Sequence, residues 1–217
     1  MPQGEQVKSA AMARLKLWAS FLDPDFAHAQ RVARLALQLH DGLAAKGLVP
    51  RDRSRDLRSI LQAAALLHEI GRSKGQKKHH NAHARMVRKL HAPLGWNAKD
   101  LQFAGLISRY HRGALPSQEQ SEFGRLRAGQ RKKVELLAGI LRLAEALDAP
   151  RDSAVGRLRV ESNNGYLAVF ADGYSANAPL AERVARARYL LESVYEKPVM
   201  VRGEVKTGGR SSGQRHR

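Results

Sequence analysis

The sequence predicts a mainly α-helical fold, a bundle of helices followed by a small α+β subdomain. From residue 5 to about 150, segment after segment carries apolar residues at helical spacing. After Pro150 the pattern changes to short β-rich runs around a turn. A content of 43% hydrophobic and 27% charged residues is typical of a globular protein. We therefore expect a helical domain over 1–150, an α+β subdomain over 151–205 and a disordered basic tail over 206–217.

The segment "DPDFAHAQRVARLALQLHDGLAAKG" predicts a helix with its own start and stop signals. We expect Asp23 to be the N-cap and Pro24 the first helical residue, with the end near Gly47. His28 opens the apolar stripe of this helix, which continues at steps of four, three and four residues. The other members of the stripe are Val32, Leu35 and Leu39.

The segment "SRDLRSILQAAALLHEIG" predicts the next helix. Ser54 is its expected cap and Gly71 its expected stop. The apolar stripe of this helix leads onto His68 by a step of four residues, which places the imidazole on the buried face. The stripe consists of Leu57, Leu61 and Ala64.

Two later segments repeat this arrangement of a polar residue on an apolar face. In "NAKDLQFAGLISRYHRG" the face carries Phe103, Ile107 and His111. In "RKKVELLAGILRLAEALDAP", which ends at Pro150, it carries Leu137, Leu141, Glu145 and Asp148. A single histidine on such a face is usually a hydrogen-bonded core residue. Because four helices each carry a histidine or carboxylate, we expect the stripes to converge on a shared polar centre.

The C-terminal region predicts a ββαβ unit. Two β-rich runs, 157–162 and 166–171, are separated by the turn-forming "NNG". An amphipathic helix, "PLAERVARARYLLESVYEKP", and a last strand, "VMVRGEV", follow. We expect this unit to pack on the helical part.

The composition narrows the function classes. A formal net charge of +18 attracts polyanions such as nucleic acid, polyphosphate or nucleotides. The chain has no cysteine, which excludes disulfides and thiolate metal sites. Aromatic residues are only 6% and form no interleaved run to stack bases. The longest apolar run is far below the ~20 residues of a membrane span, and the N-terminus lacks a secretory signal, so we expect a cytoplasmic protein.

Histidine and carboxylate side chains suit divalent metals, which bind phosphoryl oxygens. Basic residues accompany them and are suited to phosphate binding. A solvated basic face is the alternative interpretation of these charges. The candidate substrate-binding residues are Arg72, Lys74, Lys77 and Lys78 after the His68-Glu69 pair, Arg109 and Arg112 beside His111, and Arg142 before Glu145.

Four motifs, "AALLHEIG", "HHNAHARMV", "RYHRGALP" and "LLAGILRLAEALDAPRD", together resemble the C-terminal helical half of the Ppx/GppA (exopolyphosphatase/guanosine pentaphosphate phosphatase) family. That half belongs to the HD-domain superfamily of metal-dependent phosphohydrolases, so the resemblance implies an HD-domain-like bundle over about residues 25 to 205. In that family the helical half is often regarded as a substrate-binding and regulatory module. Hydrolysis is done by actin-like ATPase-fold domains N-terminal to it, so we do not expect that active site here.

The resemblance also implies site residues. Glu69 and Glu145 stand where metal-binding members of the superfamily have aspartates, and the extra methylene moves the carboxylate oxygens by more than an ångström. Metal-site distances are held to within ~0.2 Å, so this departure weighs against a working metal. His68 and Glu69 would be the catalytic pair. The implied metal ligands are His28, His68, Glu69, His83, His111 and Glu145.

Three functional hypotheses follow. The first is an HD-like phosphohydrolase-type domain that binds a polyphosphate or guanosine polyphosphate, with hydrolysis left open. The second is a non-catalytic polyphosphate- or nucleotide-binding regulatory module with a vestigial metal site, and the third is an RNA-binding protein that uses charge alone. The cofactor is a divalent metal, with Mn, Fe, Mg and Zn not distinguished, or none. A homodimer is one alternative to a monomer.

Overall fold

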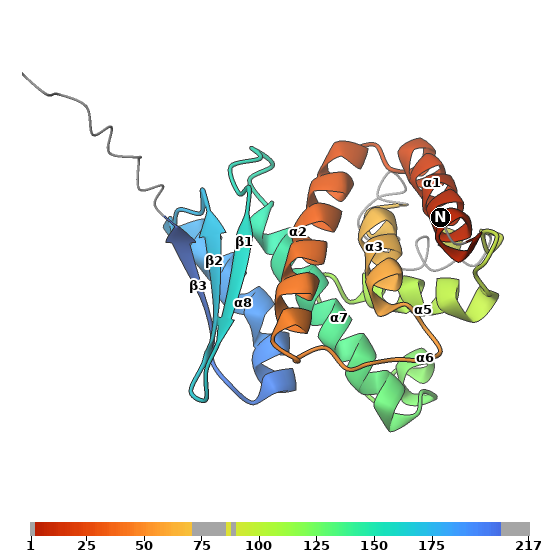
Figure 1. Ribbon diagram of the computed structural model, residues 1–217. Helices are drawn as coiled ribbons and strands as arrows, with labels where there is room; N and C mark the ends of the chain where they lie inside the picture. Colours follow the sequence, from red (N-terminus) through yellow and green to blue (C-terminus); the bar gives the residue numbers. More distant parts are fainter. Residues whose placement is uncertain (1–2, 71–85, 88–89, 205–217) are drawn as a thin grey trace, which may run out of the picture.

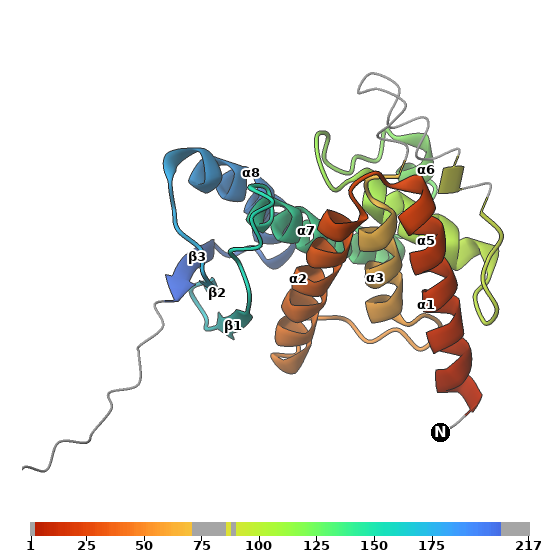
Figure 2. The same cartoon turned by 90° about the horizontal axis from the view of Figure 1, so that it is seen from above.

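The computed structural model describes residues 3–70, 86–87 and 90–204 of the chain. A long central helix, α7, divides the molecule: α1, α3 and α5 lie on one side, and a three-stranded sheet with α8 lies on the other (Figures 1 and 2). This arrangement confirms the predicted class, a helical domain followed by a small α+β part. Among the described helices, none is long and apolar enough to cross a membrane.

Helices α1 (Gln3–Leu22) and α2 (Phe26–Ala45) open the chain. The predicted cap of α2 was wrong by two residues. Asp25 is the N-cap, because its carboxylate accepts the backbone N–H of His28 at 3.3 Å. Asp23 instead accepts the N–H of Asp25 at 2.9 Å, which tightens the turn before the helix. The helix ends before Gly47, near the predicted stop, and Gly47 adopts a left-handed φ of 71°.

Helix α3 (Leu57–Leu67) begins at Asp56 rather than at the predicted Ser54. The Asp56 carboxylate accepts the N–H of Ser59 at 3.1 Å, whereas Ser54 donates both its N–H and its hydroxyl to Asp52. Ser54 therefore belongs to the turn before the helix. His68 is the C-cap of α3, and the predicted stop at Gly71 lies outside the described residues.

Helix α5 (Ala98–Arg109) begins in a capping box, in which Asn97 and Asp100 each accept the other's backbone N–H. After it come the short helix α6 (Ser121–Gly124) and the long α7 (Ala128–Leu147), with Asp148 as C-cap. Helix α5 lies within its predicted segment, whereas α7 starts three residues earlier than predicted, at Ala128 instead of Arg131. The ends of α3, α5 and α7 carry His68, His111 and Asp148, which positions these polar groups.

The C-terminal part has the predicted ββαβ order. Strands β1 (Leu158–Ser162) and β2 (Leu167–Asp172) form an antiparallel hairpin. Helix α8 (Ala178–Tyr195) then crosses over to β3 (Val199–Glu204), which pairs with β2 in parallel. The sheet order is β1-β2-β3. A parallel pair needs such a crossover, because its strands run in the same direction.

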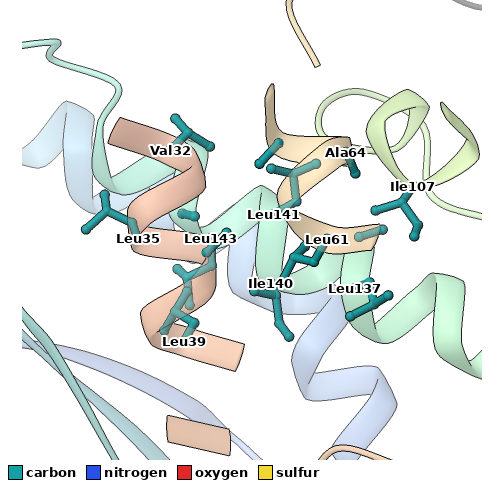
Figure 3. Close-up of a cluster of buried hydrophobic side chains, with 14 of the residues drawn as sticks. Val32, Leu35, Leu39, Leu61, Ala64, Ile107, Leu137, Ile140, Leu141 and Leu143 are labelled. Atoms are coloured by element: carbon teal, nitrogen blue, oxygen red, sulfur yellow. The ribbon is translucent and has the colours of Figure 1, made fainter. Parts of the chain in front are cut away.

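One hydrophobic core joins the helices. Figure 3 shows side chains of α2, α3, α5 and α7 meeting, with Leu39, Leu61, Ile107 and Leu141 among them. The predicted apolar stripes of these four helices thus face one another. Buried residues of the sheet and of α8, such as Val160 and Leu191, belong to the same core.

Helices α7 and α8 approach closely at Gly139. A Cβ atom there would lie 2.9 Å from Cδ2 of Leu191 and 3.3 Å from its backbone nitrogen. Glycine therefore lets α8 lie against α7, and this contact sets the distance between the arginines of α8 and the polar end of α7.

Candidate functional site

The structure brings together three of the four predicted histidines. The ring centroids of His28 and His68 are 5.5 Å apart, and those of His68 and His111 are 5.0 Å apart. All three residues are buried. They come from the start of α2, the end of α3 and the turn after α5, so the predicted convergence of the apolar stripes is present. We call these three residues the histidine cluster.

Each ring of the histidine cluster is held through its Nδ1 atom. Nδ1 of His68 lies 2.6 Å from the carbonyl of Ala65, and Nδ1 of His111 lies 2.6 Å from the carbonyl of Ser108. Because a carbonyl only accepts, both Nδ1 atoms carry the proton. Nδ1 of His28 lies 2.6 Å from the Asp148 carboxylate, to which Arg31 also donates at 3.0 Å. These partners leave Nε2 of His28 and of His68 without a hydrogen bond among the described residues, the orientation that second-shell acceptors impose on metal-binding histidines.

Two buried glutamates lie beside the cluster, and Arg112 joins them. Its guanidinium donates to the Glu145 carboxylate and lies 3.5 Å from Oε1 of Glu69. These glutamates are the two for which the sequence resemblance implied aspartate positions. In this arrangement their negative charges are compensated by a guanidinium from the "RYHR" motif.

Arg151 supplies a second cation to Glu69. Its guanidinium pairs with Asp25, the cap of α2, and lies 3.9 Å from Oε1 of Glu69. The backbone of Arg151 has a φ of 61°, a left-handed conformation that is unfavourable for a side chain with a Cβ. The contacts with Asp25 and Glu69 hold Arg151 in this conformation.

The donor groups fit a divalent metal. One ligand atom each from His28, His68 and Glu69 lie within 4.8 Å of one another. The Nε2 atoms of His28 and His68 are buried and have no hydrogen-bond partner among the described residues. Two neutral imidazoles and a carboxylate are ligands that Zn, Mn and Fe accept. Arg112 and Arg151 weigh against a metal, since their guanidinium groups already lie beside the carboxylates.

Burial controls the ionisation of this site. It lowers the pKa of His68 to about 4, against the opposing charge of Glu69, so His68 is neutral near pH 7. Burial acts to lower the pKa of Arg112 as well, but the hydrogen bond to Glu145 and the charges of both glutamates raise it above its usual value. Arg112 is therefore a permanent cation here.

His111 of the cluster borders a cleft of about 520 Å³ between α7, α8 and the turn after α5. His111, Arg112 and Glu145 form its inner wall. Arg142 lines it too and donates to the backbone carbonyls of Tyr110 and Gly113, which fixes that turn. Two arginines of α8 complete the wall opposite; they are Arg183 and Arg186. We call this the arginine cleft.

Not every predicted site residue lies at the histidine cluster or the arginine cleft. Arg109 pairs with Glu122 at 3.2 Å and lines a separate groove beside α6, because it lies on the last turn of α5 whereas Arg112 follows the end of the helix. The remaining predicted residues lie outside the described part of the chain: Arg72, Lys74, Lys77, Lys78 and His83.

The structure adds residues that the sequence analysis did not select. Asp148, predicted only to lie on the apolar face of its helix, is the partner of His28. Arg151 follows the helix in "LLAGILRLAEALDAPRD", the motif from which Glu145 was selected as a site residue. Arg183 and Arg186 lie on an amphipathic helix whose spacing identifies an exposed basic face but not the cleft that the face borders.

Comparison with protein families gives one match. The sequence model described as Ppx/GppA phosphatase, domain III, matches residues 14–185. The matched range contains the histidine cluster, both glutamates, Arg112 and Arg151, and it ends after Arg183. Comparison with curated proteins gives no match.

Proposed function

The chain belongs to the Ppx/GppA phosphatase family through domain III, and from this premise we propose that it binds a phosphorylated polyanion of the polyphosphate or guanosine polyphosphate class in the arginine cleft. One observation carries the proposal: Arg112 touches the buried carboxylates and also lines the cleft with three other arginines. Guanidinium groups suit phosphate because they donate two parallel hydrogen bonds.

The positions of the arginines favour an extended anion over a single phosphate. Arg112 and Arg142 lie on the inner wall, whereas Arg183 and Arg186 lie on the exposed face of α8. Arg186 is paired with Glu182 in an exposed i,i+4 contact, which contributes little and is easily exchanged for a phosphate. A chain of phosphoryl groups would contact both walls.

The double variant R183Q/R186Q tests the proposal. We expect it to weaken binding of polyphosphate of fixed length at least tenfold, and to lower the slope of log K against log salt, since fewer counterions are released. The double variant R58Q/R159Q is the matched control: it loses the same charge, at α3 and β1. Equal losses in the two variants would mean that net charge alone binds the polyanion.

Binding of single-stranded RNA and of a guanosine polyphosphate is measured with the same variants. Binding of polyphosphate and of the nucleotide should depend on Arg183 and Arg186 more than binding of RNA does, because RNA would contact the basic surface at many places. If RNA binds more tightly than polyphosphate and loses as much affinity in R183Q/R186Q, the cleft is a nucleic-acid site and the proposal is wrong.

Hydrolysis is a second candidate function, favoured by the Nε2 atoms of His28 and His68, which have no hydrogen-bond partner in the part of the chain that the structure describes. His28, His68 and Glu69 would hold a divalent metal, whose contribution when bound is to polarise a phosphoryl oxygen. The arginines of the cleft would bind the phosphoryl chain next to His111 and Glu145, which line the same cleft. Phosphate release that requires added metal and is lost in His68→Gln would support the enzyme. If the protein binds the polyanion tightly but releases no phosphate with any divalent metal, it is a non-catalytic binding module.

A further inference from the structure

A second groove, of about 460 Å³, lies between α5, α6 and the start of α7. It is separate from the arginine cleft, because the two share no lining residue in the described part of the chain. Arg109, one of the predicted substrate-binding residues, lines this groove, whereas Arg112 lines the cleft. We call it the α5–α6 groove, and the proposed function does not involve it.

The base of the α5–α6 groove is apolar. Phe103 and Leu106 of α5 line it and are buried, and so is Val87. Leu126, half-buried, adds to this surface from the turn between α6 and α7. Such a surface binds the apolar part of a small molecule, because contact removes both surfaces from water.

The turn that carries Leu126 is held in place by its neighbours. Arg131 donates to the backbone carbonyls of Gly124 and Leu126, at 3.4 and 2.9 Å. Phe123, which is buried, packs edge-on against Tyr110 with the ring centroids 5.9 Å apart. This wall of the groove is therefore formed before any ligand binds, as is usual for small-molecule sites.

The rim of the groove is basic. Arg55 already pairs with Asp100 at 3.1 Å. Arg109 already pairs with Glu122. The other two cations of the rim, Lys99 and Arg125, are exposed and form no ion pair with a described residue. The residues outside the described ranges contain no aspartate or glutamate, so no acidic side chain among them neutralises these two.

Two glutamine side chains also line the groove, Gln102 and Gln130. The amide oxygen of Gln130 accepts the backbone N–H of Arg127 at 3.2 Å, so its amide nitrogen remains as a donor. Gln102 is exposed, and its amide forms no hydrogen bond with a described residue. A glutamine amide carries both donors and an acceptor, and it matches the edge of an adenine base.

We propose that the α5–α6 groove is a nucleotide-binding site, with the base on the apolar surface, its edge at the glutamine amides and the phosphate at Lys99 and Arg125. A nucleotide combines the three features that the groove offers partners for: an apolar face, a polar edge and an anion. Inorganic polyphosphate has no part that suits the apolar surface. An alkyl phosphate has none that suits the amides.

Equilibrium dialysis of adenosine 5′-monophosphate (AMP) against the full chain tests this proposal. AMP has a single phosphate and so lacks the phosphoryl chain that the arginine cleft would bind. We expect AMP to bind about tenfold more tightly than ribose 5-phosphate, which lacks the base and gains nothing from the apolar surface. Adenosine, which lacks the phosphate, should also bind about tenfold more weakly.

Variants locate the site. K99Q/R125Q should weaken AMP binding at least fivefold, and its fold should be unaffected because both side chains are exposed. Gln102→Ala should weaken binding of AMP but not of ribose 5-phosphate. R183Q/R186Q is the matched control: it loses the same charge at the arginine cleft, so it should keep its AMP affinity. Polyphosphate should show the reverse dependence on the two double variants.

Three results would each overturn the proposal. If ribose 5-phosphate binds as tightly as AMP, the phosphate alone accounts for binding and the apolar surface has no role. If both double variants lose AMP affinity equally, net charge binds the nucleotide. If octyl phosphate binds more tightly than AMP, depends on Lys99 and Arg125 and is indifferent to Gln102→Ala, the groove takes an alkyl amphiphile. Polyphosphate binding in the same variants reports on the arginine cleft, so a failure there is distinguishable from a failure here.

Discussion

Nδ1 of His28 lies 2.6 Å from Oδ2 of Asp148, a contact between residues 120 positions apart that ties the start of α2 to the end of α7. The same carboxylate accepts from Nε of Arg31, so one buried group orients an imidazole and neutralises a guanidinium. Asp148 thus fixes the orientation of His28, one of the three members of the histidine cluster.

Asp148→Asn should therefore destabilise the protein. The amide keeps the size but leaves Arg31 without its counter-charge, and hydrogen bonds to charged groups contribute about 1.5–3 kcal/mol. We expect urea unfolding to show a loss of about 2 kcal/mol. The same change at Asp172, at the end of β2, is the control and should stay within about 0.5 kcal/mol. Equal effects would show that the His28–Asp148 contact contributes no particular stability.

The double variant Glu69→Asp/Glu145→Asp should bind Mn²⁺ about tenfold more tightly than the wild type. Arg112 already lies 3.5 Å from Glu69, and a carboxylate one methylene shorter would retract from the guanidinium, so the cation that competes with the metal is held less firmly. Calorimetric titration after EDTA treatment measures this. Unchanged or weaker Mn²⁺ binding would mean that glutamate length does not limit the site.

The stability of the protein should fall as the pH decreases from about 6.5 to about 4, in part because of His68. Its pKa is lowered to about 4 in the folded state by burial, so between these values the unfolded state binds the extra proton and is favoured. Over the whole range from pH 6.5 to pH 4, this difference in the His68 pKa lowers the free energy of unfolding by roughly 3 kcal/mol. Urea unfolding in EDTA at several pH values should show a steeper decline in the wild type than in His68→Gln. Parallel profiles would place the His68 pKa near its ordinary value.

Gly139→Ala should destabilise the protein by about 1–2 kcal/mol and weaken polyphosphate binding. The added Cβ would meet the side chain and backbone of Leu191, and overpacking of this kind exceeds the gain in helix propensity. Because α8 must then move from α7, the two walls of the arginine cleft would separate. Gly129→Ala is the control on the same helix, with open space around its Cβ. If both changes weaken polyphosphate binding equally, the α7–α8 distance does not matter to the cleft.

Local sequence pattern determined which elements form and which faces are buried. The stripe that leads from Leu57 to His68, and the step from Phe103 to His111, place each imidazole on an apolar face, and the structure buries both. The run "NNG" between two β-rich segments likewise determined the hairpin. These features depend on residues a few positions apart, so the periodicity of the backbone alone exposes them.

Only the structure decides between neighbouring residues that are candidates for the same helix N-cap. Asp23 and Asp25 are equally good caps by residue type, and Asp52, Ser54 and Asp56 compete in the same way. The direction from which the chain enters each helix decided for Asp25 and Asp56, because only their carboxylates reach the N–H of the third helical residue.

The partners of the site residues were likewise a matter of tertiary structure. Pairing of Arg112 with Glu69 and Glu145, of Asp148 with His28, and the position of α8 across the arginine cleft join residues tens of positions apart. The amino-acid sequence determined that histidines, glutamates and arginines gather at the ends of helices. Only the packing of α7 against α8 and of the helix ends against one another decided that the glutamates face a guanidinium, because side-chain contacts depend on helix angles and distances that no local pattern encodes.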